Sequence, residues 1–226
     1  MIPLMDRDDF CRLEFHCHTS YSKDSLTSPQ VLIAAARRKG LDRVVVTDHN
    51  TIAGAREARA LAPDLIIVGE EIMTTKGELL AAFVTEEVPA GLSPQEAIRR
   101  LREQGAFISV SHPFDRLRSG HWAMEDLLEI LPLVDAIETF NARCMWPGSN
   151  ARAEAFAREH GVQATVGSDA HAPFEVGHAT MVLPPFEGAE ELRDAVRQMR
   201  PRLRRSPLWV HLTSRYAVIR KRLQKP

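Results

Sequence analysis

The sequence predicts an α/β protein built as a small β/α barrel, and three observations support this prediction. Short, β-branched apolar runs alternate with amphipathic helical stretches along most of the 226 residues. Six or seven such units suit a barrel of parallel strands with right-handed crossovers better than an open sheet. The sequence has neither a Gly-x-Gly-x-x-Gly motif after its first strand nor a Gly-Lys-Ser/Thr loop, which disfavours an open nucleotide-binding sheet.

Each unit carries local signals for its strand and its helix. The first strand is expected at residues 13–15. The first helix is expected at residues 29–39, where Ser28 can cap it, a proline fits its first position and a glycine follows its end. Three consecutive valines indicate a buried strand at residues 43–47. Further strands are expected at residues 65–68, 79–84, 106–110, 134–139 and 163–166, and further helices at residues 53–62, 93–104, 124–131, 150–160 and 190–199.

The segment after residue 200 is weakly patterned and strongly basic. We expect one domain at residues 11–200 and a basic extension at residues 201–226 that packs on the barrel or trails from it. From residue 195 onward there are ten Lys or Arg and no Asp or Glu, which leaves 19 basic against 30 acidic residues in 1–194, a net charge of −11. Either the extension is a solvated segment that offsets an acidic body, or it attracts nucleic acid or phosphate.

Neither membrane insertion nor secretion is indicated by the sequence. No apolar run approaches the roughly 18 residues that span a bilayer, and residues 1–10 lack the apolar core of a secretion signal. We therefore expect a cytoplasmic protein with no membrane contact and no obligate protein partner. Three cysteines without a Cys-x-x-Cys pair argue against a disulfide framework or a zinc ribbon. Cys17 lies between two histidines, but alternation along a strand would point it away from them.

Polar side chains gather at the ends of the expected strands. His16 and His18 close the first strand and leave the same face of it, where two imidazoles can bind one cation. The corresponding positions after later strands hold Asp48 and His49, Glu70 and Glu71, His112, and Asp169 and His171. Active sites of β/α barrels are built at this end of the strands. We therefore expect a metal cluster of two or three divalent ions, and imidazole with carboxylate ligands suits zinc, manganese or iron.

These motifs, taken together and in order, resemble the polymerase and histidinol phosphatase (PHP) family over residues 13–182. The resemblance is carried by His16-Cys17-His18, Tyr21-Ser22-Lys23-Asp24-Ser25, Thr47-Asp48-His49-Asn50, Gly69-Glu70-Glu71-Ile72, Ser111-His112-Pro113 and Gly167-Ser168-Asp169-Ala170-His171. It implies a distorted seven-stranded β/α barrel with a trinuclear metal site at the C-terminal ends of the strands. Members of the family hydrolyse phosphomonoesters, cyclic phosphodiesters or nucleotide ends.

The resemblance also implies how the ligands are divided. It places a first ion on His16, His18, Glu71 and Asp169, a second on Glu71 and His112, and a third on Asp24, His49 and His171. Many relatives have a further histidine on the strand after the glutamate. Glu78 stands at that position here and is expected to serve as an oxygen ligand or to leave the second site weaker.

Some of these residues are also expected to have catalytic or orienting roles. Glu71, Asp169 and His171 are the expected catalytic residues. Asp48 is expected to orient His49 rather than to bind metal. Glu70 points opposite to its neighbour in an extended segment and is therefore not the expected bridging ligand.

Phosphate recognition requires cations near the cluster. Arg143 and Arg116 each come shortly after a strand end, and a guanidinium group binds phosphate in a bidentate manner. The Asn-x-Arg loop that contains Arg143 also resembles phosphatase members of the family. Arg118 is a lesser candidate. We therefore predict that Arg143 and Arg116 bind the substrate.

The predicted function is metal-dependent hydrolysis of phosphate esters by a di- or trinuclear cluster that supplies metal-bound hydroxide as the nucleophile. The expected substrate is a small phosphorylated compound. A nucleotide or a short oligonucleotide remains open, through nucleoside-bisphosphate phosphatase or 5′-3′ exonuclease activity. Two other classes also remain open: a non-catalytic metal-binding scaffold, and metal-assisted hydrolysis of C–N bonds.

Overall fold

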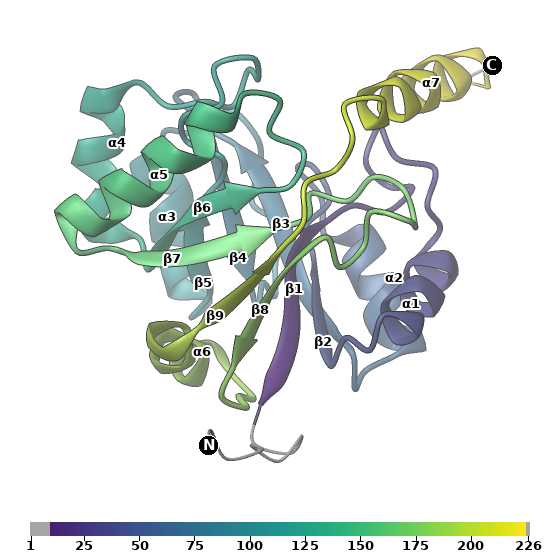
Figure 1. Ribbon diagram of the computed structural model, residues 1–226, viewed down its shortest axis with the longest axis horizontal. Helices are drawn as coiled ribbons and strands as arrows, with labels where there is room; N and C mark the ends of the chain where they lie inside the picture. The colour runs from purple at the N-terminus through teal and green to yellow at the C-terminus, as the bar shows by residue number, and fades with distance from the viewer. Residues whose placement is uncertain (1–9, 225–226) are drawn as a thin grey trace.

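The computed structural model describes residues 10–224 and shows nine strands in one sheet, with helices around it (Figure 1). Residues 225–226, the last two of the predicted basic extension, lie outside the described part, as do residues 1–9. The strands are β1 (Cys11–Cys17), β2 (Arg43–Val46), β3 (Ile66–Met73), β4 (Glu78–Ala82), β5 (Phe107–Val110), β6 (Ala136–Asn141), β7 (Gln163–Gly167), β8 (Ala179–Leu183) and β9 (Arg200–Leu203). The α-helices are α1 (Pro29–Arg38), α2 (Ala53–Leu61), α3 (Pro94–Glu103), α4 (Met124–Ile130), α5 (Pro147–His160), α6 (Ala189–Ala195) and α7 (Val210–Leu223).

The sheet forms a nearly closed barrel, so the predicted α/β barrel class is confirmed. Its strand order is β7-β6-β5-β4-β3-β2-β1-β8-β9. The sheet closes where the end of β7 meets β1 and β8: His18 N donates to Ala170 O at 2.9 Å, and Ala179 N donates to Ser168 Oγ at 2.9 Å. A closed sheet leaves few edge groups unpaired and brings the ends of its strands around one mouth.

The expectation of a purely parallel sheet is wrong. β1, β2 and β3 are parallel neighbours, and so are β5, β6 and β7. In contrast, β4 runs antiparallel to both β3 and β5, and β8 runs antiparallel to both β1 and β9. The link from Met73 to Glu78 is too short for a crossover helix, so the chain turns back as a hairpin.

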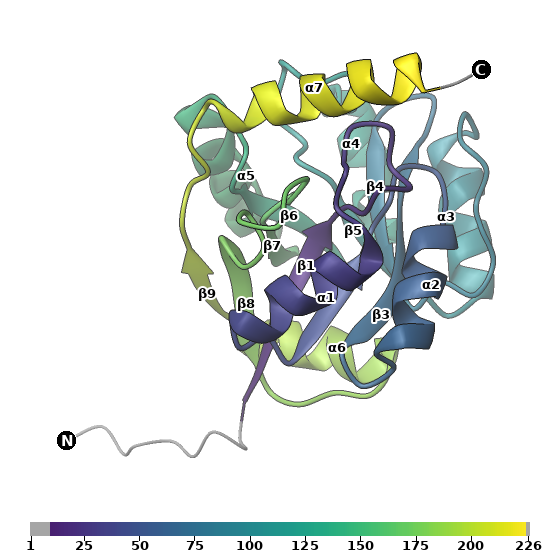
Figure 2. The ribbon, with the colours of Figure 1, turned by 90° about the vertical axis from the view of Figure 1, so that its right-hand side faces the viewer.

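Three apolar clusters stabilise the barrel from inside and outside. One fills the interior with residues such as Phe15, Leu80 and Phe107, and it continues to Leu192 of α6. The other two lie between the sheet and the outer helices, with α1 and α2 on one side and α3, α4 and α5 on the other. In Figures 1 and 2, α6 covers one end of the barrel and α7 lies across the opposite end.

The helix starts follow the expected chemistry. Ser28 caps α1 by accepting a hydrogen bond from Val31 N, and Ser93 caps α3 by accepting one from Glu96 N. Both helices carry proline in their first turn. These local signals place both helices close to their predicted positions.

The C-terminal part differs most from the prediction. The strands β8 and β9 and the helix α7 were not expected, and residues 200/201, the predicted start of the basic extension, lie in β9. The predicted helix at residues 190–199 ends earlier, because α6 gives way to a short 3-10 turn, η3 (Val196–Gln198). α7 packs on the barrel.

Within residues 10–224, the structure has no helix with the length and apolar character needed to cross a bilayer.

Candidate metal centre

The barrel brings the predicted ligands together at one end. His16 comes from β1 and Glu71 from β3. His18, His49, His112 and the pair Asp169 and His171 follow β1, β2, β5 and β7. A parallel bridge joins His49 to Glu71, with Asn50 N donating to Glu71 O and Glu71 N donating to Asp48 O. Glu78 reaches the same end because β4 is antiparallel, so its first residue lies beside the last residues of its neighbours.

The first group of ligand atoms surrounds one point. His16 Nε2 lies 3.4 Å from Glu71 Oε2 and 3.7 Å from Asp169 Oδ1. His18 Nε2 lies 3.4 Å and 3.3 Å from the same two oxygens. All four side chains are buried. These are the four residues that family resemblance assigned to the first ion.

A second group shares Glu71. Glu71 Oε1 lies 3.3 Å from His112 Nε2, and Glu78 Oε2 lies at the same distance from that nitrogen. His49 Nδ1 lies 3.0 Å from Glu71 Oε2 and 4.0 Å from Glu78 Oε1. The Glu78 carboxylate therefore lies beside the predicted ligands of the second ion.

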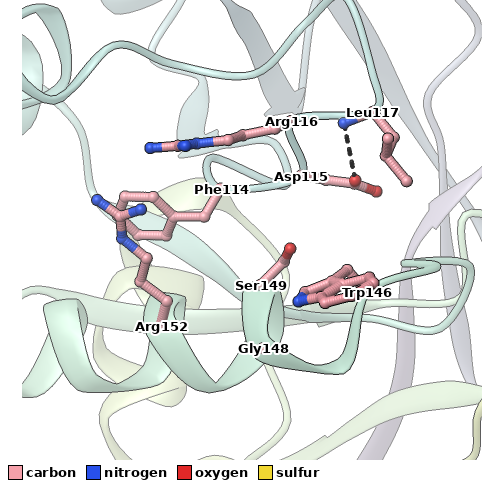
Figure 3. A pocket seen from close by; sticks show the side chains of 8 residues that line it. All are labelled: Phe114, Asp115, Arg116, Leu117, Trp146, Gly148, Ser149 and Arg152. Carbon is pink, nitrogen blue, oxygen red and sulfur yellow. Dashed lines mark hydrogen bonds between the residues drawn. The ribbon is translucent and has the colours of Figure 1, made fainter.

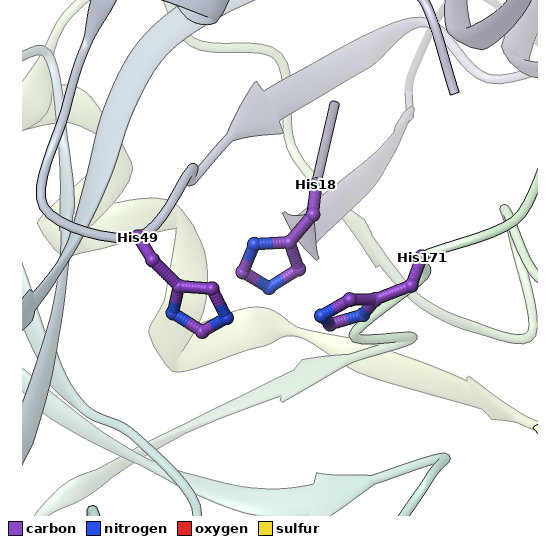
Figure 4. A group of neighbouring side chains, drawn as sticks. All are labelled: His18, His49 and His171. Atoms are coloured by element: carbon purple, nitrogen blue, oxygen red, sulfur yellow. The ribbon is translucent and has the colours of Figure 1, made fainter. Parts of the chain in front are cut away.

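A third group is centred on histidine rings. His171 Nε2 lies 3.2 Å from Asp24 Oδ2, and His49 Nε2 lies 3.6 Å from Asp24 Oδ1. The ring centroids of His18 and His171 are 4.1 Å apart, and those of His18 and His49 are 4.4 Å apart. Figure 4 shows the three rings converging, and they come from the segments that follow β1, β2 and β7. Three sets of these side chains could each hold an ion: His16 with His18 and Glu71, His49 with Glu71 and Glu78, and His18 with His49 and His171.

The donor set fits divalent metal ions. Buried polar atoms normally have hydrogen-bond partners, yet several atoms that point into the cluster have none. They are His16 Nε2, His18 Nε2, Asp24 Oδ1, Glu71 Oε2, His112 Nε2 and Asp169 Oδ1. Imidazole nitrogens and carboxylate oxygens are the ligands of zinc, manganese and iron. Bound ions would satisfy all of these atoms at once.

Hydrogen bonds on the outer side of the rings select the nitrogen that faces the cluster. Nδ1 of His16 contacts Glu138 Oε1 at 2.9 Å, Nδ1 of His18 contacts Ser22 Oγ at 3.1 Å, and Nδ1 of His171 contacts the Asp169 carbonyl at 2.8 Å. When Nδ1 carries the proton, Nε2 is free to coordinate. Glu138 also accepts hydrogen bonds from His112 N and from Asn141 Nδ2.

The backbone is strained at two predicted ligands. Asp169 has φ of 51° and His112 has φ of 21°, in a region that side chains rarely occupy. Such conformations cost roughly 1–3 kcal/mol and concentrate at functional sites. Gly167 permits the close approach of β7 to β1, because a Cβ on it would lie 2.4 Å from the Cβ of His16.

The charges of the cluster compensate one another. Burial alone would raise the pKa of the Asp169 carboxyl, but Arg118 and His16 hold it well below its ordinary value. Burial would lower the pKa of His16, but Glu71 and Glu138 raise it well above the ordinary value. Burial and the neighbouring His171 hold the pKa of His18 well below that value.

Of the arginines, Arg118 contacts the cluster most directly. Its Nη1 lies 2.5 Å from Asp169 Oδ2, and its Nε lies 3.4 Å from Asp115 Oδ2.

Arg116, in contrast, is exposed and forms no ion pair with the cluster in the described part of the chain. Arg116 lines a separate pocket of about 400 Å³. Figure 3 shows Arg116 and Arg152 at one side of this pocket and Trp146 at the other. Substrate binding by Arg116 stays a prediction, and Arg118 is the arginine whose guanidinium contacts a predicted ligand.

Arg143 is buried beside the cluster but is held by protein groups. Its Nε lies 3.2 Å from Glu175 Oε1, and its Nη2 donates to Val210 O and Ser214 Oγ. Glu175 in turn accepts a hydrogen bond from His171 N. The guanidinium thus links the His171 loop to α7, and its role in substrate binding stays a prediction.

Cys17, Glu70 and Asp48 contact groups other than the ligand atoms of the cluster. The Cys17 thiol donates to Val45 O and lies in the outer apolar cluster, away from the metal ligands. Glu70 accepts from Val88 N and also points away. Asp48 accepts hydrogen bonds from the Thr19 and Ser22 hydroxyls. The Ser22 hydroxyl in turn accepts from His49 N, so Asp48 positions His49 through Ser22 and not by a contact with its ring.

Sequence reasoning missed Glu138 and Ser22. Both are polar residues next to or within recognised motifs, but their side chains contact ligands from other strands. The one available signal was an acid at residue 138 within a predicted strand.

Comparison with known proteins identifies the family. A family model described as the PHP domain matches residues 14–105, and one described as PHP-associated matches residues 147–201. An uncharacterized protein from Methanocaldococcus jannaschii is 36% identical over 144 residues, which cover 58% of this chain and 82% of that protein. The chain belongs to the PHP domain family.

Two further matches are informative about fold and sequence. A two-domain protein from Bacteroides vulgatus, described as containing a predicted PHP-like metal-dependent phosphoesterase, superimposes with a TM-score of 0.72 at 22% identity. The match covers 90% of this chain and 68% of that protein. A 5′-3′ exoribonuclease from Haemophilus influenzae is 36% identical over 66 residues, 28% of this chain and 24% of that protein. The PHP barrel predicted from the motifs is therefore confirmed.

Proposed function

We propose that this PHP protein hydrolyses phosphate esters with two or three divalent metal ions at the cluster. The observation that carries the proposal is the convergence of buried ligand atoms that have no hydrogen-bond partner. Three groups of side chains each offer ligand atoms within 4.8 Å of one another. Buried polar atoms without a partner cost free energy, and bound cations would supply the missing partner.

The residues divide into three roles in this proposal. Glu71, Asp169 and His171 are assigned the catalytic role because they would hold the ions that act on the phosphate. Bound divalent ions lower the pKa of water and polarise a phosphoryl oxygen. Glu138 keeps the His16 ring in the orientation and tautomer that the site requires. Arg118 donates hydrogen bonds to the nonbridging oxygens of the substrate, because it lies at the cluster with a cationic guanidinium.

The test couples elemental analysis to a panel of phosphate esters. Wild-type protein and Asp169→Ala are compared, with Asp194→Ala as the matched control because that carboxylate is exposed. We expect Asp169→Ala to lose at least one ion and to lose activity by more than about a hundredfold. Retention of both metal and activity in this variant would show that the site assignment is wrong.

Other outcomes distinguish the remaining classes. Metal-replete protein that cleaves no ester across the panel would favour the scaffold interpretation. Cleavage of amides instead of phosphates would favour C–N hydrolysis.

A nucleotide or oligonucleotide substrate is the second candidate. The basic residues from 195 onward support it, and so does the partial similarity to the exoribonuclease. Arg215 and Arg220 are exposed on α7, the helix that lies across the end of the barrel with the metal centre. If single-stranded nucleic acid contacts both, Arg215→Gln with Arg220→Gln should reduce the slope of log K against log salt by about 1.4. An unchanged slope would count against this substrate class.

A further inference from the structure

The helix α7 lies over the end of the barrel that holds the metal centre (Figures 1 and 2). Near the start of α7, Arg143 Nη2 donates to Val210 O at 2.9 Å and to Ser214 Oγ at 2.8 Å. Midway along, Tyr216 and Ala217 line a small cavity whose wall includes His171. The basic extension is therefore adjacent to the ligands.

Apolar burial does little to fix the position of α7. Only Val210 and Ala217 are buried along this helix. Leu212, Ile219 and Leu223 are 64%, 57% and 82% exposed. Polar contacts at the two ends of α7 therefore hold it in place.

The contact near the C-terminal end of α7 is made by Lys221. Its Nζ donates to the carbonyl oxygens of Ser20, at 2.5 Å, and of Ser22, at 2.6 Å. Both carbonyls belong to residues 18–28, the segment that joins β1 to α1 and carries Asp24. The ammonium group thus binds the backbone of the segment that presents a predicted ligand of the third ion.

Ser22 connects this contact to the histidines. Its hydroxyl contacts His18 Nδ1 at 3.1 Å, donates to Asp48 and accepts from His49 N at 3.1 Å. Its carbonyl accepts from Ser25 N as well as from Lys221. A shift of this residue would therefore change the positions of two ligand histidines, and Asp24 is only two residues further along the chain.

We infer that Lys221 is a positioning residue of the metal centre, which holds the segment around Ser22 and Asp24 so that the third ion can bind. The inference rests on the proposed metal site. It assigns a function to the basic extension that differs from nucleic-acid attraction. The other basic residues of the last turn of α7 do not share this role, because Arg220 and Arg222 are exposed.

The test compares Lys221→Met with wild type, with Lys221→Arg as the conservative variant and Arg222→Met as the matched control. Metal-free protein is titrated with Mn²⁺ by calorimetry, and amide exchange of residues 19–25 is followed by mass spectrometry. In Lys221→Met we expect Mn²⁺ affinity at one class of site to fall at least about tenfold, as for other groups that orient ligands. We expect exchange in residues 19–25 to accelerate by about tenfold.

Each variant gives a decisive result. Lys221→Arg keeps donors at this position and should recover part of both effects, while Arg222→Met should match wild type. Unchanged Mn²⁺ affinity or unchanged exchange in Lys221→Met overturns the inference. A wild-type protein that binds no Mn²⁺, zinc or iron would instead overturn the proposed function, and the exchange data would still decide whether Lys221 holds the segment.

Discussion

Replacement of Glu138 by glutamine should weaken metal binding without removing any ligand. The Glu138 carboxylate is buried and accepts from His16 Nδ1 through one oxygen, and from His112 N and Asn141 Nδ2 through the other. A glutamine side chain has the same shape but offers only one acceptor oxygen. If that oxygen faces His112, the amide group faces Nδ1 of His16, which must then give up its proton. Nε2 of His16 would carry the proton instead and could not coordinate.

The opposite orientation of the amide is no better. Its NH₂ group would then face two donors, His112 N and Asn141 Nδ2, at 2.9 Å and 3.1 Å from the present oxygen. Loss of a carboxylate that orients a ligand histidine typically reduces metal affinity by about 10–100-fold. This corresponds to about 1.4–2.7 kcal/mol of binding free energy.

The assay is a calorimetric titration of metal-free Glu138→Gln with Mn²⁺, supported by elemental analysis after dialysis. Glu70→Gln is the matched control, because Glu70 is also a buried strand glutamate but points away from the cluster. Wild-type affinity in Glu138→Gln would refute the reasoning. Equal losses in both variants would show that the effect comes from general disturbance of the barrel.

Three other predictions test the site and the barrel. Arg118→Met should lower kcat/KM for a phosphate ester by about 10–100-fold, because a charge-assisted hydrogen bond to the substrate is lost, and its metal content should be unchanged. Arg116→Met is the control and should match wild type in the same steady-state kinetics. Gly167→Ala should lower the free energy of unfolding by about 1–3 kcal/mol because its Cβ would lie 2.4 Å from a ligand histidine, and Gly148→Ala, with no contact under 3.4 Å, should change it little in urea denaturation. Burial raises the pKa of the Glu70 carboxyl from 4.5 to about 8, so the stability that its protonated form contributes is present below pH 4.5 and is lost as pH rises toward 8. Glu70→Gln cannot ionise and should therefore gain stability relative to wild type between pH 5 and 8, and a constant difference across this range would contradict the assignment.

The sequence was most informative where a local pattern implies a position in space. His16 and His18 are two residues apart at the end of an apolar run, so strand geometry alone places their side chains on one face. His112 and Asp169 follow apolar runs in the same way. Parallel strands share the end at which they finish, so residues distant in the sequence could be grouped without knowledge of the strand order.

Strand direction was not predictable in the same way. Glu78 comes before its apolar run, and in a parallel strand it would lie at the far end of the barrel. The hairpin between β3 and β4 reverses the strand and brings Glu78 next to His112. The predicted strands left residues 69–78 between them, whereas β3 continues to Met73, and the short remaining link permits only a hairpin.

The amino-acid sequence by itself determined the barrel class, the family motifs and the ligand types, because these depend on short-range periodicity and on residue chemistry. Only the tertiary structure decided which outer groups control the ligands. Glu138 contacts His16 across 122 positions of the chain, and Lys221 contacts Ser22 across 199. Arg118 reaches Asp169 although the sequence favoured Arg116. Contacts of this kind arise from packing between distant segments, and neither spacing nor composition records which side chains will meet.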